Sequence, residues 1–193
     1  MLKRLMLVIP LVLSLVSCGP IIGQLMRAAD GVKNFQVVSG DLVALRKGQH
    51  ILVVGPFDMA PGAWEIARGD DAAYFSTELN RSGFFYAELH MGDRYAKAKK
   101  NIAEAKSKSA AQLKVDYELE AEPDLLMFAT VLSRDTIVAP TRGIIMEVGY
   151  RLEFYNPTTT KSTVVVINVR EPFKDCIKLV VEELTRRVVA ASL

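Results

Sequence analysis

The segment "HILVVGPFD", from His50 to Asp58, decides the fold class of this chain. Its apolar part, Ile51 to Val54, is too short for a helix and rich in β-branched residues, which is typical of a buried strand. Gly55 and Pro56 close the run. We therefore expect a sheet that contains this strand in its interior.

Helical periodicity follows this strand in two places. A first helix begins at Asp70 or Asp71, whose carboxylate can cap it, and ends at Gly83. Its expected inward positions are Ala72, Phe75 and Leu79. Residues 84–90 then predict a strand, and a second helix begins near Asp93. The expected inward positions of that helix are Tyr95, Ala98, Ile102 and Ala105.

Shorter elements lie on either side of the buried strand. Residues 35–38 and 41–46 predict two short strands, with a turn at 47–50. Residues 59–64, "MAPGAW", predict a loop.

The segment 109–122 has two interpretations. Alternating apolar and charged residues from Leu113 to Leu119 favour a strand. The lead from Ala110 to Gln112 and the many glutamates favour a helix. We predict a helix and keep the strand as the alternative.

The remainder of the chain predicts three strands and a closing helix. The strands cover 124–133, 144–156 and 162–170, and the Thr-rich turn "PTTTK" joins the last two into a hairpin. One face of the middle strand carries Ile144, Met146, Val148, Tyr150, Leu152 and Phe154. The helix around Cys176 ends the domain. This order predicts a mixed α/β fold, in which a single mixed sheet is packed by helices.

The N-terminus predicts export and lipidation. Lys3 and Arg4 precede an apolar run that is too short to cross a bilayer, as in a signal peptide. The run ends in Leu15-Val16-Ser17-Cys18, which resembles the bacterial lipobox. The resemblance implies that residues 1–17 are removed and that Cys18 is acylated. The alternative is an ordinary secretion signal with a chance cysteine.

This assignment predicts the domain boundaries and the cellular location of the protein. We expect a lipidated tether at 18–34 and a single α/β domain at 35–193. More than one acyl chain makes membrane anchoring stable, so the membrane is a predicted partner through Cys18. Gly19, where enterobacterial inner-membrane lipoproteins have Asp, suggests the outer membrane, with the domain facing the periplasm.

Composition argues against nucleic acid as a partner. Removal of residues 1–17 takes away two basic and no acidic side chains, which leaves 22 of each sign. A neutral chain lacks the electrostatic footprint that nucleic-acid binding requires. Lipidation of Cys18 would leave Cys176 as the single thiol, which excludes an internal disulfide and indicates a buried core cysteine.

Familiar catalytic motifs are missing from the sequence. His50 and His90 stand outside any metal-ligand spacing, and there is no phosphate-binding loop or nucleophile elbow. We therefore expect no catalytic residues, no metal and no cofactor. A hydrolase without a recognisable motif is the weakest of the alternatives.

Four segments in order resemble a group of bacterial envelope lipoproteins. They are "ILVVGPFD" (51–58), "FSTELNRSGFF" (75–85), "EPDLLMFATV" (122–131) and "RLEFYNPTTTK" (151–161). The group includes the curli-secretion lipoproteins, the lipoprotein activators of cell-wall synthases and the related N-terminal domain of TolB. The chain departs from the pattern at Phe128, where glycine is usual. It also lacks the extra hairpin pair that builds the curli barrel, which argues against pore formation.

These observations leave two main functional hypotheses. One is a non-catalytic lipoprotein that supports an envelope complex, and the other is an accessory of lipid or lipopolysaccharide transport with an acyl-binding groove. For the first, the loop from Asp58 to Gly69 is the expected partner site, with Phe57, Asp58 and Trp64 as its candidate residues. Binding crevices tend to lie beyond the carboxyl ends of parallel strands, and tryptophan is common at interface hot spots. The alternative for Trp64 is a core position.

Overall fold

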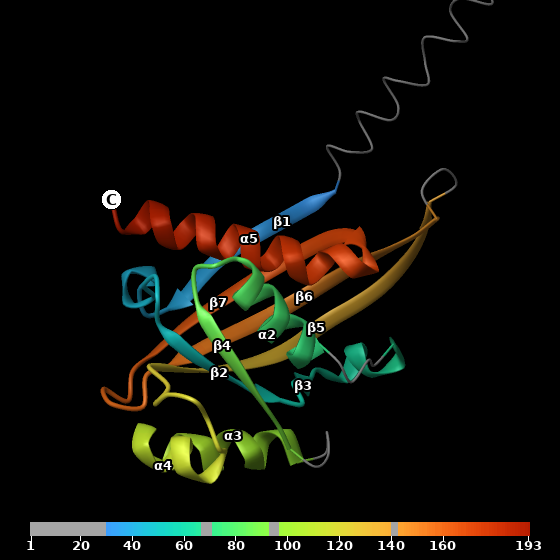
Figure 1. The fold of residues 1–193 in the computed structure, drawn as a ribbon. Helices are drawn as coiled ribbons and strands as arrows, with labels where there is room; N and C mark the ends of the chain where they lie inside the picture. Colours follow the sequence, from blue (N-terminus) through green and yellow to red (C-terminus); the bar gives the residue numbers. More distant parts are fainter. Residues whose placement is uncertain (1–29, 67–70, 93–96, 140–142) are drawn as a thin grey trace, which may run out of the picture. The chain divides into compact units, whose positions relative to one another are not determined.

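One mixed sheet of seven strands organises the protein (Figure 1). The computed structural model describes residues 30–66, 71–92, 97–139 and 143–193, without the side chains of 64–66, 139, 143, 173 and 174. The strand order is β1-β7-β6-β5-β2-β4, and β3 is attached to β5. The predicted α/β class with a mixed sheet packed by helices is confirmed.

The elements follow one another in the order that the periodicity predicts, with short additions. The strands are β1 (Gly31–Ser39), β2 (His50–Gly55), β3 (Asp58–Met59), β4 (Tyr86–Met91), β5 (Leu125–Ala139), β6 (Gly143–Tyr155) and β7 (Ser162–Pro172). The helices are α2 (Asp71–Arg81), α3 (Ala98–Ser107), α4 (Ala110–Asp116) and α5 (Phe173–Ala191), and two short 3-10 helices are η1 (Leu42–Ala44) and η2 (Pro61–Ile66).

The sheet has a parallel half and an antiparallel half. Strand β2 pairs in parallel with β4 and β5, where Ile51 lies opposite Ala87 and Leu125. Strands β5, β6 and β7 form an antiparallel meander, and β5 pairs with β6 from Leu126 to Ala139. Both edges are consequently formed by strands that have one neighbour, β1 and β4.

Helices cover both faces of the sheet (Figure 1). Helices α2 and α5 pack on one face over the larger core, which includes Ile51, Val53, Phe75, Tyr150, Val180 and Leu184. Helices α3 and α4 cover the other face over a smaller core, which includes Leu52, Val54, Ala105, Leu113 and Phe128. Strand β2 contributes alternate residues to the two cores, which explains why the sequence of this strand is apolar throughout.

The predicted strand at 41–46 is wrong. Residues Leu42–Ala44 form η1, because the Asp41 carboxylate accepts a hydrogen bond from the backbone of Val43 at 3.0 Å and caps the turn. Gly40 immediately before it has a φ of 76°, a value that ends an extended chain. Local capping thus outweighs the β propensity of the short apolar run.

Two further predictions need adjustment. The predicted loop at 59–64 contains the second residue of β3 and most of η2, and pairing with β5 orders its start. Strand β1 already begins at Gly31, within the segment expected to be a tether. Ile144 lies on the same face of β6 as Met146 and Val148, as predicted, but it is 62% exposed, because β7 extends only as far as the residue opposite Ile145 and leaves the end of the hairpin uncovered.

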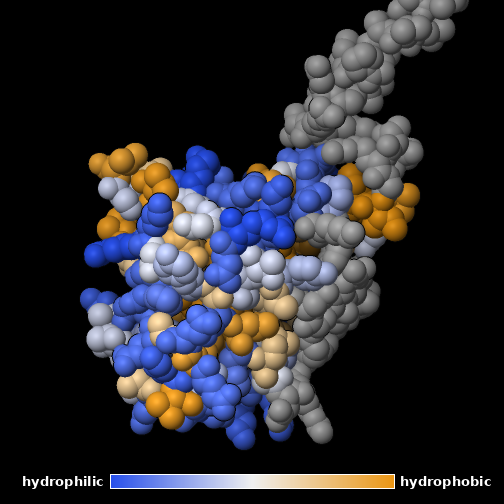
Figure 2. All heavy atoms as spheres, viewed as in Figure 1, coloured by the Kyte–Doolittle hydropathy of each residue, from blue (hydrophilic) through white to orange (hydrophobic). Residues whose placement is uncertain are grey.

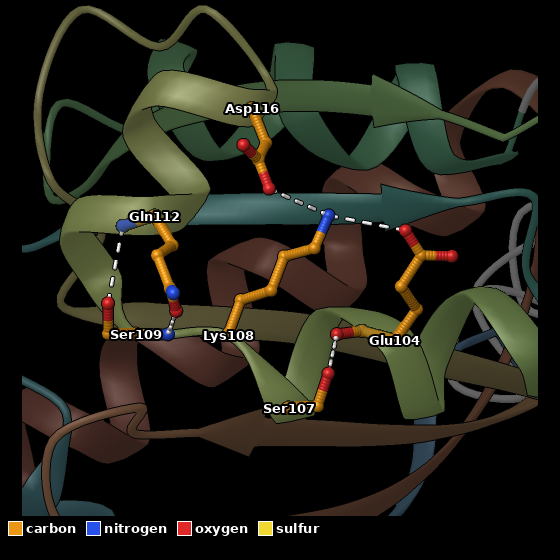
Figure 3. Close-up of polar contacts among 6 residues, drawn as sticks. All are labelled: Glu104, Ser107, Lys108, Ser109, Gln112 and Asp116. Carbon is orange, nitrogen blue, oxygen red and sulfur yellow. Dashed lines mark hydrogen bonds and ion pairs between the residues drawn. The ribbon is translucent and has the colours of Figure 1, made fainter.

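The segment 109–122 begins as a helix, as predicted. Ser109 and Gln112 form a reciprocal capping box at the start of α4, with bonds of 3.3 and 2.9 Å (Figure 3). The ammonium of Lys108 lies between the carboxylates of Glu104 and Asp116, at 3.2 and 3.0 Å, and joins the two helices. Its hydrogen bond to Asp116 raises the pKa of Lys108 above the ordinary value. Uncharged residues therefore cap α4, and the charged residues tie α3 to α4.

Candidate functional site

The residues predicted for partner binding occupy different environments. Phe57 is only 3% exposed, and its ring packs 5.5 Å from that of Phe75, so it belongs to the core. Asp58 is half-buried in β3, opposite Thr130 of β5. The side chain of Trp64 and the whole of Cys18 lie outside the described residues.

A pocket opens beside the amino ends of β2 and β5, at the end of the sheet opposite to Phe57 and Asp58. It has a volume of about 660 Å³ and a floor of three buried apolar side chains, Leu45, Leu125 and Phe154. Its walls come from the β1–β2 connection and from the β6–β7 turn. Segments far apart in the sequence therefore build the pocket.

Gly40 allows one wall to approach the sheet closely. A side chain at this position would place its Cβ 2.5 Å from the backbone oxygen of Ser162 and 2.7 Å from the Cα of Thr163. In the space that glycine leaves, the hydroxyl of Thr163 donates a hydrogen bond to the carbonyl of Asp41 at 2.9 Å. The β1–β2 connection is thereby fixed to the start of β7.

The β6–β7 turn forms the second wall and is held by its own backbone. The side-chain oxygen of Asn156 accepts hydrogen bonds from the amides of Thr158 and Thr159, at 2.9 and 2.8 Å. The amide of Asn156 donates to the carbonyl of Lys161 at 2.9 Å and closes the turn. This Asx arrangement explains why the Thr-rich segment turns where the sequence predicts it.

Two cations line the pocket together with Asp41. Arg46 and Lys161 are exposed and line it from opposite walls. Within the part of the chain that the structure describes, neither is in an ion pair with an acidic side chain. The carboxylate of Asp41 is engaged by the amide of Val43. An apolar floor with free cations beside it suits an amphiphilic ligand with an anionic group.

A buried polar cluster lies between β5 and the first turn of α2. The guanidinium of Arg134 donates to the carboxylate of Asp71, and both side chains are almost fully buried. Burial opposes the charge on Arg134, but the neighbouring Asp71 prevails and raises the pKa of the guanidinium. Asp71, one of the two predicted caps of this helix, is its first residue and closes a buried ion pair; Asp70 lies outside the described residues.

Tyr150 and Cys176 lie near this ion pair and are both protonated. Burial, with the charge of Asp71, raises the pKa of Tyr150 far above the ordinary value. Burial also raises the pKa of the Cys176 thiol to about 11. A nucleophilic cysteine requires a shift in the opposite direction. With an exposed fraction of 2%, Cys176 is the buried core residue that the sequence predicts.

The two histidines stack on tyrosines at the surface. His50 lies 5.1 Å from the ring of Tyr86, and His90 lies 3.8 Å from the ring of Tyr117. Across the described ranges, no group of three His, Cys, Asp or Glu side chains is placed to hold a metal ion. Among the helices in those ranges, none has both the length and the apolar character needed to cross a bilayer.

No protein-family model matches the sequence, and no curated protein sequence matches it either. Similar solved structures include the PelC dodecamer from Paraburkholderia phytofirmans, at 12% identity and a TM-score of 0.46, over 82% of this chain and 96% of that one. A variant of the same PelC gives a TM-score of 0.45 with the same identity and coverage. The hypothetical protein CT253 from Chlamydia trachomatis is 12% identical, with a TM-score of 0.41, over 74% of this chain and 95% of that one. Similarity at this distance does not indicate what the chain binds.

Proposed function

We propose that this protein is a lipid-anchored accessory of the bacterial envelope that supports a protein complex without catalysing a reaction. The observation that carries the proposal is the lipobox-like sequence ending at Cys18. The strand β1 begins at Gly31, only 13 residues further on, and so short a segment spans at most about 45 Å. An acylated Cys18 would keep the domain close to the bilayer, at the periplasmic face of the outer membrane.

The chemistry of the polar clusters supports a non-catalytic role. The ion pair of Asp71 and Arg134 is sealed inside the protein, where no substrate reaches it. The one described thiol, Cys176, is held in its protonated form. These groups stabilise the fold, whereas a catalytic nucleophile needs access and an adjacent base.

The loop from Asp58 to Gly69 is the proposed contact with a protein partner. Phe57 anchors its start in the core, and the pairing of Asp58 with β5 fixes the direction in which the chain leaves the sheet. Trp64 follows within this loop. The role of Phe57 in this scheme is support, and contact falls to Asp58 and Trp64.

Lipidation is tested by metabolic labelling with a fatty acid. The wild-type protein should incorporate the label and should float with membranes, whereas Cys18→Ser should do neither. Cys176→Ser is the matched control and should label like the wild type. Equal labelling of the Cys18 variant would refute the anchor.

Partner binding is tested by crosslinking intact cells before detergent extraction. A defined protein should be recovered with the wild type, and Asp58→Ala or Trp64→Ala should reduce its recovery. The variants should first be shown to melt like the wild type. A large loss of stability in Trp64→Ala, with blue-shifted tryptophan emission in the wild type, would assign Trp64 to the core instead.

The pocket favours a second candidate function, the carriage of a lipid. Its volume of about 660 Å³ and its floor of Leu45, Leu125 and Phe154 accommodate an acyl chain, and Arg46 and Lys161 can bind an anionic headgroup. Mass spectrometry of the purified protein under native conditions should then detect a co-purifying amphiphile. Ala44→Trp, at an exposed position in the wall, should displace it, and Ala44→Ser should not. If no amphiphile is ever recovered with the protein, lipid carriage is refuted and only the support of an envelope complex remains proposed.

A further inference from the structure

An exposed apolar pair lies near the end of the long β5–β6 hairpin. Val138 and Ile144 face each other across the two strands and are 77% and 62% exposed. Opposed residues of an antiparallel pair point to the same side of the ribbon, so the two side chains form one apolar surface. Figure 2 shows hydrophobic atoms gathered at this end of the molecule. We call the pair Val138 and Ile144 the hairpin tip.

The hairpin tip projects beyond the rest of the sheet. On one side, the pairing of β6 with β7 stops where Ile145 meets Pro172. On the side of β5 that faces away from β6, the last strand pairing is between Val131 and Met59 of β3. The end of the hairpin is therefore a two-stranded ribbon, and within the described part of the chain no further strand pairs with either side of it. Interior packing does not account for apolar side chains in such a place.

The chain enters the domain at this same end. Strand β1 runs antiparallel to its neighbour β7, since Gly40 and Asp41, directly after the end of β1, lie beside Thr163 at the start of β7 (Figure 1). The first residues of β1 consequently lie toward Pro172, at the end of β7 where the hairpin projects. A tether from an acylated Cys18 would thus reach the domain on the side of the hairpin tip.

We infer that the hairpin tip inserts into the surface of the bilayer that carries the lipid anchor. This inference rests on the proposed lipidation of Cys18. Two side chains bury too little area to bind a membrane by themselves, and they are also too few for an ordinary protein interface. A tethered domain is already concentrated at the bilayer, so a weak contact is enough to choose its orientation. The tip would orient the domain, and the acyl chains would hold it.

The orientation has a consequence for the pocket. The pocket lies at the amino ends of β2 and β5, whereas the hairpin tip lies at the carboxyl end of β5. A domain that rests on its hairpin tip turns Arg46 and Lys161 away from the membrane. The pocket would then open toward the aqueous compartment.

Fluorescence quenching by spin-labelled lipids tests the inference on the full-length, lipidated protein. The vesicles contain phosphatidylethanolamine and phosphatidylglycerol with a headgroup-region nitroxide lipid. One protein carries a dye on Val138→Cys, and a second carries it on Thr158→Cys in the exposed β6–β7 turn at the far end of the sheet. Both use a Cys176→Ala background. Quenching should be several-fold stronger at position 138 than at 158.

A second pair of variants tests the cause of this contact. Ile144→Asp in the protein labelled at position 138 should abolish the difference in quenching, because a carboxylate resists entry into the bilayer. Ile144→Leu should preserve it. Both should remain folded, since Ile144 is exposed and lies beyond the end of β7.

Flotation of each protein with the vesicles tests the lipid anchor separately from the orientation of the domain. Vesicle-bound protein with equal quenching at positions 138 and 158 would overturn the orientation and leave the anchor intact. The same holds if Ile144→Asp leaves the quenching unchanged. Wild-type protein that fails to float would overturn the lipid anchor and, with it, this inference. Disulfide crosslinking of the unlabelled Val138→Cys protein to another copy of the chain on the vesicles, at the expense of quenching in the labelled protein, would also refute the membrane contact.

Discussion

The two ends of the sheet contrast in shape and chemistry. At the amino ends of β2 and β5, the connections fold back on the sheet and enclose a pocket over Phe154, with Arg46 and Lys161 at its walls. At the carboxyl ends of β2 and β5, the β5–β6 hairpin extends as an exposed ribbon. The buried ion pair of Asp71 and Arg134 joins the base of that ribbon to α2. One end is concave and cationic, and the other is projecting and apolar.

This contrast teaches where partner sites arise in a mixed sheet. The parallel half suggests the carboxyl ends of the strands as the binding edge. In this protein the pocket lies instead at the amino ends of β2 and β5, because the β6–β7 turn and the β1–β2 connection meet there. The antiparallel half of the sheet thus creates a site that the parallel half does not predict.

The largest expected effect concerns the buried ion pair. Asp71→Ala should lower the free energy of unfolding by about 3–5 kcal/mol, because it leaves the Arg134 charge buried without its carboxylate. Urea denaturation measures the loss. Glu182→Ala is the control, since its carboxylate lies 3.9 Å from Lys178 in an exposed pair and should contribute less than about 1 kcal/mol. Equal losses in the two variants would contradict the burial of this cluster.

The next effect concerns the wall of the pocket. Gly40→Ala should cost about 1–2 kcal/mol for its left-handed backbone and more for the clash with the backbone of Ser162 and Thr163. Gly48→Ala has a φ of 84° but open space around its Cβ, so it should show only the backbone cost. Thermal unfolding of both compares them directly. The close approach would be disproved by equal shifts in Tm.

A smaller effect concerns acid stability near the pocket. Burial opposes the charge on Glu153, but hydrogen bonds from Lys106 and Ser162, at 2.8 and 2.6 Å, hold its pKa below the ordinary value. The stability that this carboxylate contributes is therefore complete above its unfolded pKa of about 4.3 and is lost as the pH falls through the lowered folded value. Urea denaturation as a function of pH should show a shallower acid loss in Glu153→Gln. Glu120→Gln, at an exposed position, is the control and should follow the wild type.

The smallest effect is kinetic and leaves stability unchanged. Cys176 should react slowly with a thiol reagent at neutral pH, because it is 2% exposed and burial raises its pKa to about 11. Denaturant should restore the rate of a free thiol. A cysteine introduced at Val138 should react quickly in the native protein, since that position is 77% exposed. Rapid native labelling of Cys176 would contradict its burial.

Local patterns in the sequence predicted most of the elements. The strand at Ile51–Val54, the helix that starts at Ala110 and the periodic helix α5 each depend on residue types and spacing within a short segment. At 41–46 the cap formed by Asp41 outweighed the β propensity of the apolar run. Ile144 lies on the predicted face of its strand, but the end of β7 leaves it uncovered.

The sequence by itself predicted the α/β class and the burial of Cys176, which the structure confirms, because both depend on composition, spacing or periodicity along the chain. Only the tertiary structure placed Arg134 beside Asp71, assembled the pocket from two connections far apart in the sequence and brought the start of β1 to the end of the sheet where the hairpin projects. The physical reason is the order of strands. Contacts between residues more than 60 positions apart arise from the pairing of β1 with β7 and of β2 with β5, and no local signal encodes that order.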